Sequence, residues 1–143
     1  MDRSEENLWL ELVVSSPVLF VTNDFGPRAG GIETFVIGLI ERRPFGQTIV
    51  YTSAQAGSEE YDKAWKTDFG VTVIRDRAKI LLPTPRVARN VARIIKESEI
   101  QVAAFGAAAP LGLLSASMKR AGVQKTAALT HGHEVWWAKV FPF

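Results

Sequence analysis

Short apolar runs alternate with segments of helical periodicity along most of this chain. The predicted strands cover 17–22, 47–53, 71–75, 100–105 and 126–130. Between them, apolar residues recur every three or four positions, as they do on a helix that buries one face. The predicted helices cover 31–43, a short stretch around 61–66, a segment that begins at Pro85, and 110–121. Thr84 is suited to cap the third of these helices, and Gly122 to end the fourth.

This alternation predicts a doubly wound α/β fold of the Rossmann-like type. Strands joined through helices by short connections run parallel, and a parallel sheet needs helices on both faces to bury it. With 143 residues, 47% of them hydrophobic, the chain has room for one domain with a proper core. We expect that domain to span 17–143, and residues 1–16 to form a poorly ordered N-terminal extension.

Composition and charge exclude several classes of protein. The chain contains no cysteine, which rules out disulfides and thiolate metal sites and suits a reducing compartment. No apolar run reaches the roughly 18–20 residues that span a bilayer. The first sixteen residues carry four acidic side chains against one arginine, which is unlike a secretory signal. We therefore expect a cytoplasmic protein.

The segment VTNDFGPRAGGIETF, residues 21–35, joins the first predicted strand to the first helix and contains three glycines. In a doubly wound sheet this junction lies at the edge where ligands bind, and Gly30 and Gly31 let backbone amides approach an anion there. A P-loop is excluded because Ile32 and Glu33 stand where its lysine would follow, and the G-x-G-x-x-G of a dinucleotide fold is missing. The alternative is that the glycines only make a tight turn and allow close helix packing.

Both histidines of the protein lie in THGHE, residues 130–134, at the end of the last predicted strand. This motif opens on the same edge of the sheet as the glycine turn. Zinc is not expected, because His131, His133 and Glu134 have no further ligand of the right type at a suitable spacing. One alternative is that a histidine only bonds to backbone at the strand end. Two imidazoles and a carboxylate crowded at a ligand edge favour recognition of a polar ligand.

A resemblance to a known family comes from the segments TNDFGPRAGGIETF, LLPTP, FGAAAPLGLL and THGHEVWW, taken together and in this order. They resemble the N-terminal half of the GT-B glycosyltransferases of family 4. Within that family they are most similar to the actinobacterial GDP-mannose-dependent phosphatidylinositol monomannoside mannosyltransferases. The resemblance runs from about Pro17 to Trp137, nearly the whole chain. The glycine turn is common to many sugar transferases, whereas FGAAAP together with THGHE is much narrower.

The resemblance implies a site for a nucleotide-sugar donor at this edge of the sheet. Gly30 and Gly31 match the family's glycine turn, whose amides face the donor diphosphate and the transferred sugar. His131 matches the catalytic histidine beside the sugar and the acceptor, and His133 and Glu134 complete the donor-binding motif. The family is retaining and needs no metal or other cofactor. Catalysis then rests on stabilising the departing nucleoside diphosphate and an oxocarbenium-like sugar.

The resemblance also implies partners beyond the residues of this chain. A GT-B enzyme has a second Rossmann-like domain that grips the nucleotide with an Arg/Lys pair and a Glu-x7-Glu motif. We expect the missing C-terminal domain to follow, and the present chain alone to be inactive. The implied reaction transfers mannose from GDP-mannose to a phosphatidylinositol mannoside, a lipid acceptor, with no nucleic acid involved. The alternatives are a family 4 transferase with another donor and acceptor, or a non-catalytic nucleotide- or lipid-binding module.

Positive charge is concentrated in one window of the sequence, although the net charge of the chain is only +2. Seven basic residues and one acid lie between Arg75 and Lys96. Four of the basic residues are spaced three or four apart along one helix: Arg86, Arg89, Arg93 and Lys96. The loop before this helix contributes three apolar residues that we expect to be exposed: Ile80, Leu81 and Leu82.

Cations almost without acids, beside an exposed apolar loop, suit a peripheral protein that contacts an anionic membrane. For a lipid acceptor, that membrane surface is expected to be the inner face of the plasma membrane. The alternative is that the stripe is only a solvated helix face. Nucleic-acid binding would explain the charge but not the apolar loop.

Overall fold

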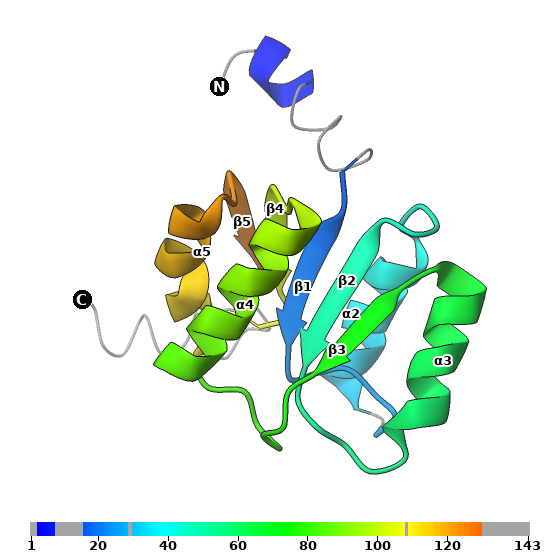
Figure 1. Cartoon of the computed structure of the whole chain (residues 1–143). Helices are drawn as coiled ribbons and strands as arrows, with labels where there is room; N and C mark the ends of the chain where they lie inside the picture. Colours follow the sequence, from blue (N-terminus) through cyan, green and yellow to red (C-terminus); the bar gives the residue numbers. More distant parts are fainter. Residues whose placement is uncertain (1–2, 8–15, 29, 108, 130–143) are drawn as a thin grey trace.

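A computed structural model describes residues 3–7, 16–28, 30–107 and 109–129 of the chain. Its core is a five-stranded parallel sheet in the order β3-β2-β1-β4-β5 (Figure 1). The strands are β1 (Val18–Thr22), β2 (Thr48–Thr52), β3 (Thr72–Arg75), β4 (Val102–Phe105) and β5 (Lys125–Ala128). The helices are α2 (Gly31–Glu41), α3 (Ser58–Phe69), α4 (Pro85–Ser98), the 3₁₀ helix η1 (Leu111–Leu114) and α5 (Ser115–Ala121), preceded by a short helix over 3–7. The predicted doubly wound α/β fold is confirmed.

The central strand β1 shows why helices cover both faces of the sheet. All five of its residues are buried, so its side chains supply apolar surface to both sides. Val18 and Phe20 pack in the cluster formed with α2 and α3, whereas Leu19 and Val21 pack in the cluster formed with α4 and α5. A strand buried in this way needs apolar residues at successive positions, which is why the run lacks the polar alternation of a surface strand. Figure 1 shows α4 and α5 on one face and α2 and α3 on the other.

Two predicted helices differ in extent from the structure. The helix predicted around 61–66 is the twelve-residue α3. Gly57 precedes it and Gly70 follows it, both in the left-handed conformation, with φ of +74° and +67°. At Gly70 this conformation ends the helix. The helix predicted over 110–121 divides into η1 and α5. The strand predicted over 126–130 begins one residue earlier, at Lys125.

The ends of α4 and α5 follow the capping that the sequence predicts. Thr84 Oγ1 accepts a hydrogen bond from the backbone N–H of Val87 at 3.3 Å, and Pro85 occupies the first helical position. Gly122 follows α5 with φ of +128°, a conformation that side chains rarely adopt. Both helices are therefore delimited by local sequence.

An aromatic cluster attaches the loop after β1 to α3. Phe25 lies 5.5 Å from Tyr61 and 5.3 Å from Trp65 between ring centroids, and Trp65 lies 4.9 Å from Phe69. Tyr61, Trp65 and Phe69 recur every four residues, so they form one stripe of the helix. A Cβ on Gly26 would overlap the Tyr61 ring, so only glycine lets this loop lie so close to α3. The loop after β1 therefore packs on the aromatic stripe of α3.

Candidate functional site

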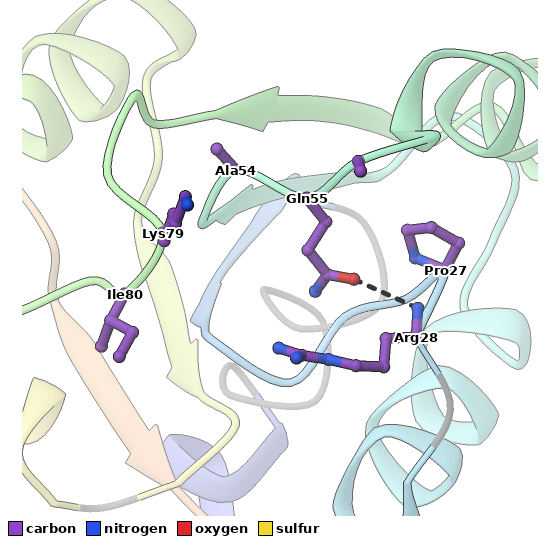
Figure 2. A pocket seen from close by; sticks show the side chains of 7 residues that line it. Pro27, Arg28, Ala54, Gln55, Lys79 and Ile80 are labelled. Carbon is purple, nitrogen blue, oxygen red and sulfur yellow. Dashed lines mark hydrogen bonds between the residues drawn. The ribbon is translucent and has the colours of Figure 1, made fainter.

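The segments that follow β1, β2 and β3 surround a hollow of about 630 Å³ at the carboxyl edge of the sheet. Its lining residues are Pro27, Arg28, Ala54, Gln55, Ala56, Lys79 and Ile80. Figure 2 shows Pro27 and Arg28 on one side of the hollow and Lys79 and Ile80 on the other. Ligands of doubly wound sheets bind at this edge. Two cations and an amide give the hollow groups that can hold hydroxyl or phosphate oxygens.

Gln55 fastens the segment after β2 to the loop after β1. Its Oε1 accepts a hydrogen bond from the backbone N–H of Arg28 at 3.1 Å (Figure 2), and its Nε2 donates to the carbonyl of Phe25 at 2.9 Å. The side-chain amide thus satisfies one backbone N–H and one backbone carbonyl of a loop that lies outside the helices and strands. Two of the walls of the hollow are held together by this residue.

Arg75, the last residue of β3, connects three segments around the hollow. Its Nη2 donates to the carbonyl of Gly26 at 2.6 Å, and its Nη1 donates to the carbonyl of Ser53 at 3.1 Å. Nε and Nη2 also bind both carboxylate oxygens of Asp62 on α3, at 2.9 and 2.8 Å. The guanidinium carbon lies 5.8 Å from the centre of the Phe25 ring, and the side chain is 11% exposed. Such a forked, nearly buried contact is specific to arginine.

The sequence pattern did not reveal this role, because Arg75 stands there only as one cation of the basic window. A weak signal was available: a cation ends a strand at the edge where the loops converge. Its partner Asp62 lies thirteen residues earlier, on α3, so the pair could not be recognised from spacing. Arg75 is a positioning residue for the hollow and not one of its lining residues.

The glycine pair begins α2 beside this hollow. Gly30 is extended, with φ of −163° and ψ of 172°, and neither Gly30 nor Gly31 has a positive φ, so the backbone does not require glycine. A Cβ on Gly31 would meet nothing within 4 Å, which contradicts the alternative of close helix packing at that position. A Cβ on Gly30 would meet only the flexible carboxylate of Glu33. No side chain caps the first turn of α2, and the Cβ position of Gly31 lies in open space.

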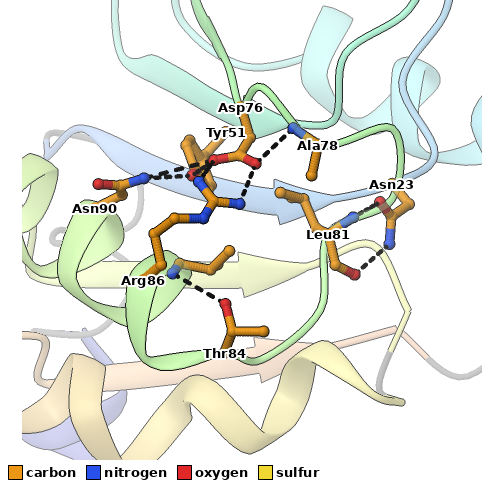
Figure 3. A network of polar contacts seen from close by, with 9 residues as sticks. Asn23, Tyr51, Asp76, Ala78, Leu81, Thr84, Arg86 and Asn90 are labelled. Atoms are coloured by element: carbon orange, nitrogen blue, oxygen red, sulfur yellow. Dashed lines mark hydrogen bonds and ion pairs between the residues drawn. The ribbon is translucent and has the colours of Figure 1, made fainter.

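A buried polar cluster lies at the carboxyl end of β3, next to α4 (Figure 3). The Asp76 carboxylate, 2% exposed, accepts hydrogen bonds from Tyr51 Oη at 2.6 Å and from the Arg86 guanidinium at 2.7 and 2.8 Å. The backbone N–H of Ala78 donates to it at 2.9 Å, and Asn90 Nδ2 donates to Tyr51 Oη at 3.3 Å. These contacts join β2, the end of β3 and α4.

The cluster changes the acidity of its members. The hydrogen bonds from the Arg86 guanidinium hold the pKa of Asp76 well below its usual range, despite the burial of the carboxylate, and the same pair raises the pKa of Arg86. Burial raises the pKa of Tyr51 to about 12, and the hydrogen bond to Asp76 adds to this effect. Asp76 is therefore ionised and Tyr51 is neutral over the physiological range.

Two residues of the predicted membrane surface are not exposed and free. The side chain of Leu81 is fully buried, because Asn23 binds the Leu81 backbone through both amide atoms, at 2.7 and 3.1 Å, and turns this residue inward (Figure 3). Arg86 is not a free cation, since Asp76 neutralises it. The prediction that Leu81 is exposed was wrong, and the place of Arg86 in a membrane surface stays a prediction. Ile80 and Leu82 are 65% and 51% exposed, as predicted.

The remaining cations of the stripe, Arg89, Arg93 and Lys96, are exposed along α4. We call Ile80 and Leu82, together with these three cations, the docking surface. Among the helices that the structure describes, none is long and apolar enough to cross a membrane.

The predicted site residues His131, His133 and Glu134 lie outside the described residues, so their roles stay predictions. The last described position is Leu129, whose backbone N–H donates to the carbonyl of Phe105 at 3.1 Å, so the chain is still paired with β4 there. Within the described ranges, no group of three side chains could hold a metal ion.

Comparison with known proteins gives relatives for most of the chain. No family model matches it. A GDP-mannose-dependent monoacylated alpha-(1-6)-phosphatidylinositol monomannoside mannosyltransferase of Corynebacterium glutamicum is 42% identical over 124 residues, 87% of this chain and 32% of the relative. The GDP-mannose-dependent alpha-(1-6)-phosphatidylinositol monomannoside mannosyltransferase of Mycolicibacterium smegmatis is 43% identical over 123 residues, 85% of this chain and 32% of the relative.

The protein of the same description from Mycobacterium tuberculosis is 42% identical over 127 residues, 86% of this chain and 32% of the relative. These findings confirm the resemblance that the sequence motifs predict. The chain spans about a third of the length of the curated relatives it matches.

Proposed function

We propose that this chain is the acceptor-side part of a retaining mannosyltransferase, which transfers mannose from GDP-mannose to a phosphatidylinositol mannoside. One observation carries the proposal: relatives named for GDP-mannose-dependent mannosyl transfer are 42–43% identical over 85–87% of the chain. The reaction is assigned to the full-length protein, because the chain spans 32% of those relatives. The open helix start and the hollow at the carboxyl edge of the sheet support it.

The donor diphosphate is assigned to the start of α2. The first amides of that helix have no side-chain cap, and the positive end of the helix dipole favours an anion. Gly31 leaves open space in front of these amides. His131 is assigned to the transferred sugar and the acceptor hydroxyl, with His133 and Glu134 beside the donor. Stabilising the leaving diphosphate by preorganised N–H groups lowers the barrier without a metal or a protein nucleophile.

The acceptor head group is assigned to the hollow beside the glycine pair. Arg28 and Lys79 face it from the loops after β1 and β3, so a phosphodiester can lie between two cations. Gln55 and the exposed backbone offer partners for inositol and mannose hydroxyls. Arg75 keeps the loops around this space in place through Gly26 and Ser53.

Replacing Gly31 by valine in the full-length protein is expected to raise the KM for GDP-mannose about tenfold or more. The branched side chain would occupy the space reserved for the diphosphate, and because its Cβ would meet no heavy atom within 4 Å, we expect the fold to be preserved. Transfer of radiolabelled mannose to the lipid fraction measures the effect. Absence of any mannosyl transfer by the unmodified protein would instead favour a non-catalytic nucleotide- or lipid-binding module.

Gly38→Val on the same helix is the matched control. Gly38 lies two turns from the start of α2, and a Cβ there meets only the exposed end of Arg42 at 3.1 Å. This variant shares the loss of a glycine in the helix but leaves the donor space unchanged. Equal KM values for the two variants would count against the assignment of the diphosphate to the glycine pair.

Membrane association belongs to the same proposal, since a lipid acceptor is held in a bilayer. The docking surface presents exposed apolar side chains at Ile80 and Leu82, in the loop that leads into α4 and its cations. Replacing Arg89, Arg93 and Lys96 by glutamine is expected to weaken binding to anionic vesicles about tenfold or more, because each cation adds up to about 1 kcal/mol. Binding should also fall as salt rises, since salt screens these charges. Co-sedimentation with vesicles measures both effects.

The control carries the same change in charge on the opposite face of the sheet. Arg42, Lys63 and Lys66 are exposed on or next to α2 and α3, and their replacement by glutamine should leave vesicle binding within about twofold of the parent. If both triple variants lose binding equally, net charge and not the docking surface drives the association.

A further inference from the structure

A second hollow, of about 330 Å³, lies between the edge strand β3 and helix α4. Its lining residues are Tyr51, Ile74, Arg75, Asp76, Arg77, Arg86, Asn90, Arg93 and Ile94. None of them lines the first hollow, so the two spaces are separate. Four guanidinium groups and one carboxylate meet around it, an unusual excess of one charge.

Two of the four arginines are already neutralised by carboxylates. Arg75 binds Asp62, and Arg86 binds Asp76 through both terminal nitrogens. Arg77 and Arg93 are exposed, and within the described part of the chain neither side chain has an ion pair or a hydrogen bond. The excess charge of the hollow therefore resides on these two cations, one beyond the end of β3 and one on α4.

Asp76 cannot neutralise them as well. Its side chain is 2% exposed, and its two oxygens already accept hydrogen bonds from Tyr51, Arg86 and the backbone of Ala78. Its charge is thus used inside the protein, and its bidentate bond holds the Arg86 guanidinium in one orientation. Repulsion between Asp76 and an entering anion is offset by Arg86, which binds both oxygens of the carboxylate and is 31% exposed.

Asn90 adds a neutral donor next to the cations. Its Nδ2 lies 3.3 Å from Tyr51 Oη and 3.5 Å from Asp76 Oδ1, both long for a hydrogen bond. An amide with such weak partners can donate to a ligand at little cost. Asn90 precedes Arg93 by three positions on α4, so both side chains lie on the same side of the helix.

We propose that this hollow is a phosphate-binding site, in which Arg77 and Arg93 contact the phosphate oxygens and Asn90 donates a further hydrogen bond. Two guanidinium groups without counter-ions among the described residues and a carboxylate that is already fully bonded match a phosphate monoester or inorganic phosphate. The phosphate can belong to a lipid head group or to a soluble molecule. The site differs from the donor and acceptor sites of the proposed function and does not depend on them.

Titration of the 143-residue chain with inorganic phosphate at low ionic strength tests the site. Amide chemical shifts are expected to saturate, with the largest changes at Arg77, Asn90 and Arg93. Arg93→Gln and Arg77→Gln should each weaken binding about fivefold or more, because each removes a charge-assisted contact. Arg89→Gln is the matched control, since Arg89 is an exposed cation of the same helix that does not line the hollow. Thermal unfolding checks that all three variants are folded.

A diffuse positive field predicts equal effects of Arg93→Gln and Arg89→Gln, because each removes one charge from α4. Equal effects, or shifts that do not saturate, would overturn the proposal. Vesicles of phosphatidylcholine with phosphatidic acid, whose head group is a phosphate monoester, then identify the source of the phosphate. A lipid source predicts that Arg93→Gln loses more vesicle binding than Arg89→Gln, and a soluble source predicts equal losses on vesicles with unequal affinities for inorganic phosphate. Failure of vesicle binding altogether would count against the docking surface but would leave the phosphate titration decisive.

Discussion

Replacing Arg75 by methionine is expected to lower the free energy of unfolding by about 4 kcal/mol. The substitution keeps an unbranched apolar stem but removes the guanidinium, so it leaves the Asp62 carboxylate, 20% exposed, without its partner. The carbonyls of Gly26 and Ser53 also lose their donors. Loss of one member of a largely buried ion pair is among the costliest single changes, because the other charge stays where water reaches it poorly. Urea unfolding followed by circular dichroism measures the effect.

Two further variants test the cause of this loss. Arg89→Met removes an exposed cation without carboxylate partners among the described residues and should change stability by less than about 0.5 kcal/mol. Arg75→Lys keeps the charge but cannot make the forked contacts, so it should recover only part of the stability. If Arg75→Met is as stable as Arg89→Met, the contacts around the first hollow contribute little.

The Arg75 variants also have a functional consequence. Because Arg75 holds the loops on both sides of the first hollow, Arg75→Lys in the full-length protein should raise the KM for the lipid acceptor more than it lowers kcat. A residue that acted only on global stability would lower the amount of active enzyme and leave the KM unchanged.

Replacing Asp76 by asparagine is the second large change, with an expected loss of about 3 kcal/mol in the free energy of unfolding. The variant leaves Arg86 without its counter-ion and deprives the Tyr51 hydroxyl of a charged acceptor. Asp68→Asn, at an exposed position of α3 with no described partner, is the control and should be nearly neutral. Equal stability of the two variants would mean that the interactions of the buried cluster only compensate for the cost of burying its charges.

The dependence of stability on pH tests the same cluster, and the direction of each pKa shift sets the sign of the expected change. The pKa of Asp76 is lowered in the folded protein, so its contribution is fully present above the ordinary aspartate pKa of about 3.9 and is lost as pH falls toward the folded value. The pKa of Tyr51 is raised to about 12, so its contribution is present below the ordinary tyrosine pKa of about 10 and is lost between about pH 10 and 12. Asp76→Asn should remove the acid dependence, and Tyr51→Phe the alkaline one. Unchanged pH profiles in these variants would contradict the assignment.

The order and type of the elements could be read from the sequence, because hydrophobic periodicity and capping are local. The five predicted strands are present, and Thr84, Pro85 and Gly122 delimit helices as expected. A parallel sheet with helices on both faces follows from that alternation. Sequence motifs also predicted the relatives that the comparisons found, since motif spacing is a property of the chain alone.

Which polar groups face each other was decided by the tertiary structure. Asn23 turns Leu81 inward from 58 positions away, and the order of the strands brings Asp62 to Arg75 and Tyr51 to Asp76. The position of a cation in the sequence does not identify its counter-ion. Ion pairs depend on the distances between strand ends, and the sheet sets these distances. The sequence therefore determined the fold, and only the packed structure decided which of the described charges are paired with a counter-ion.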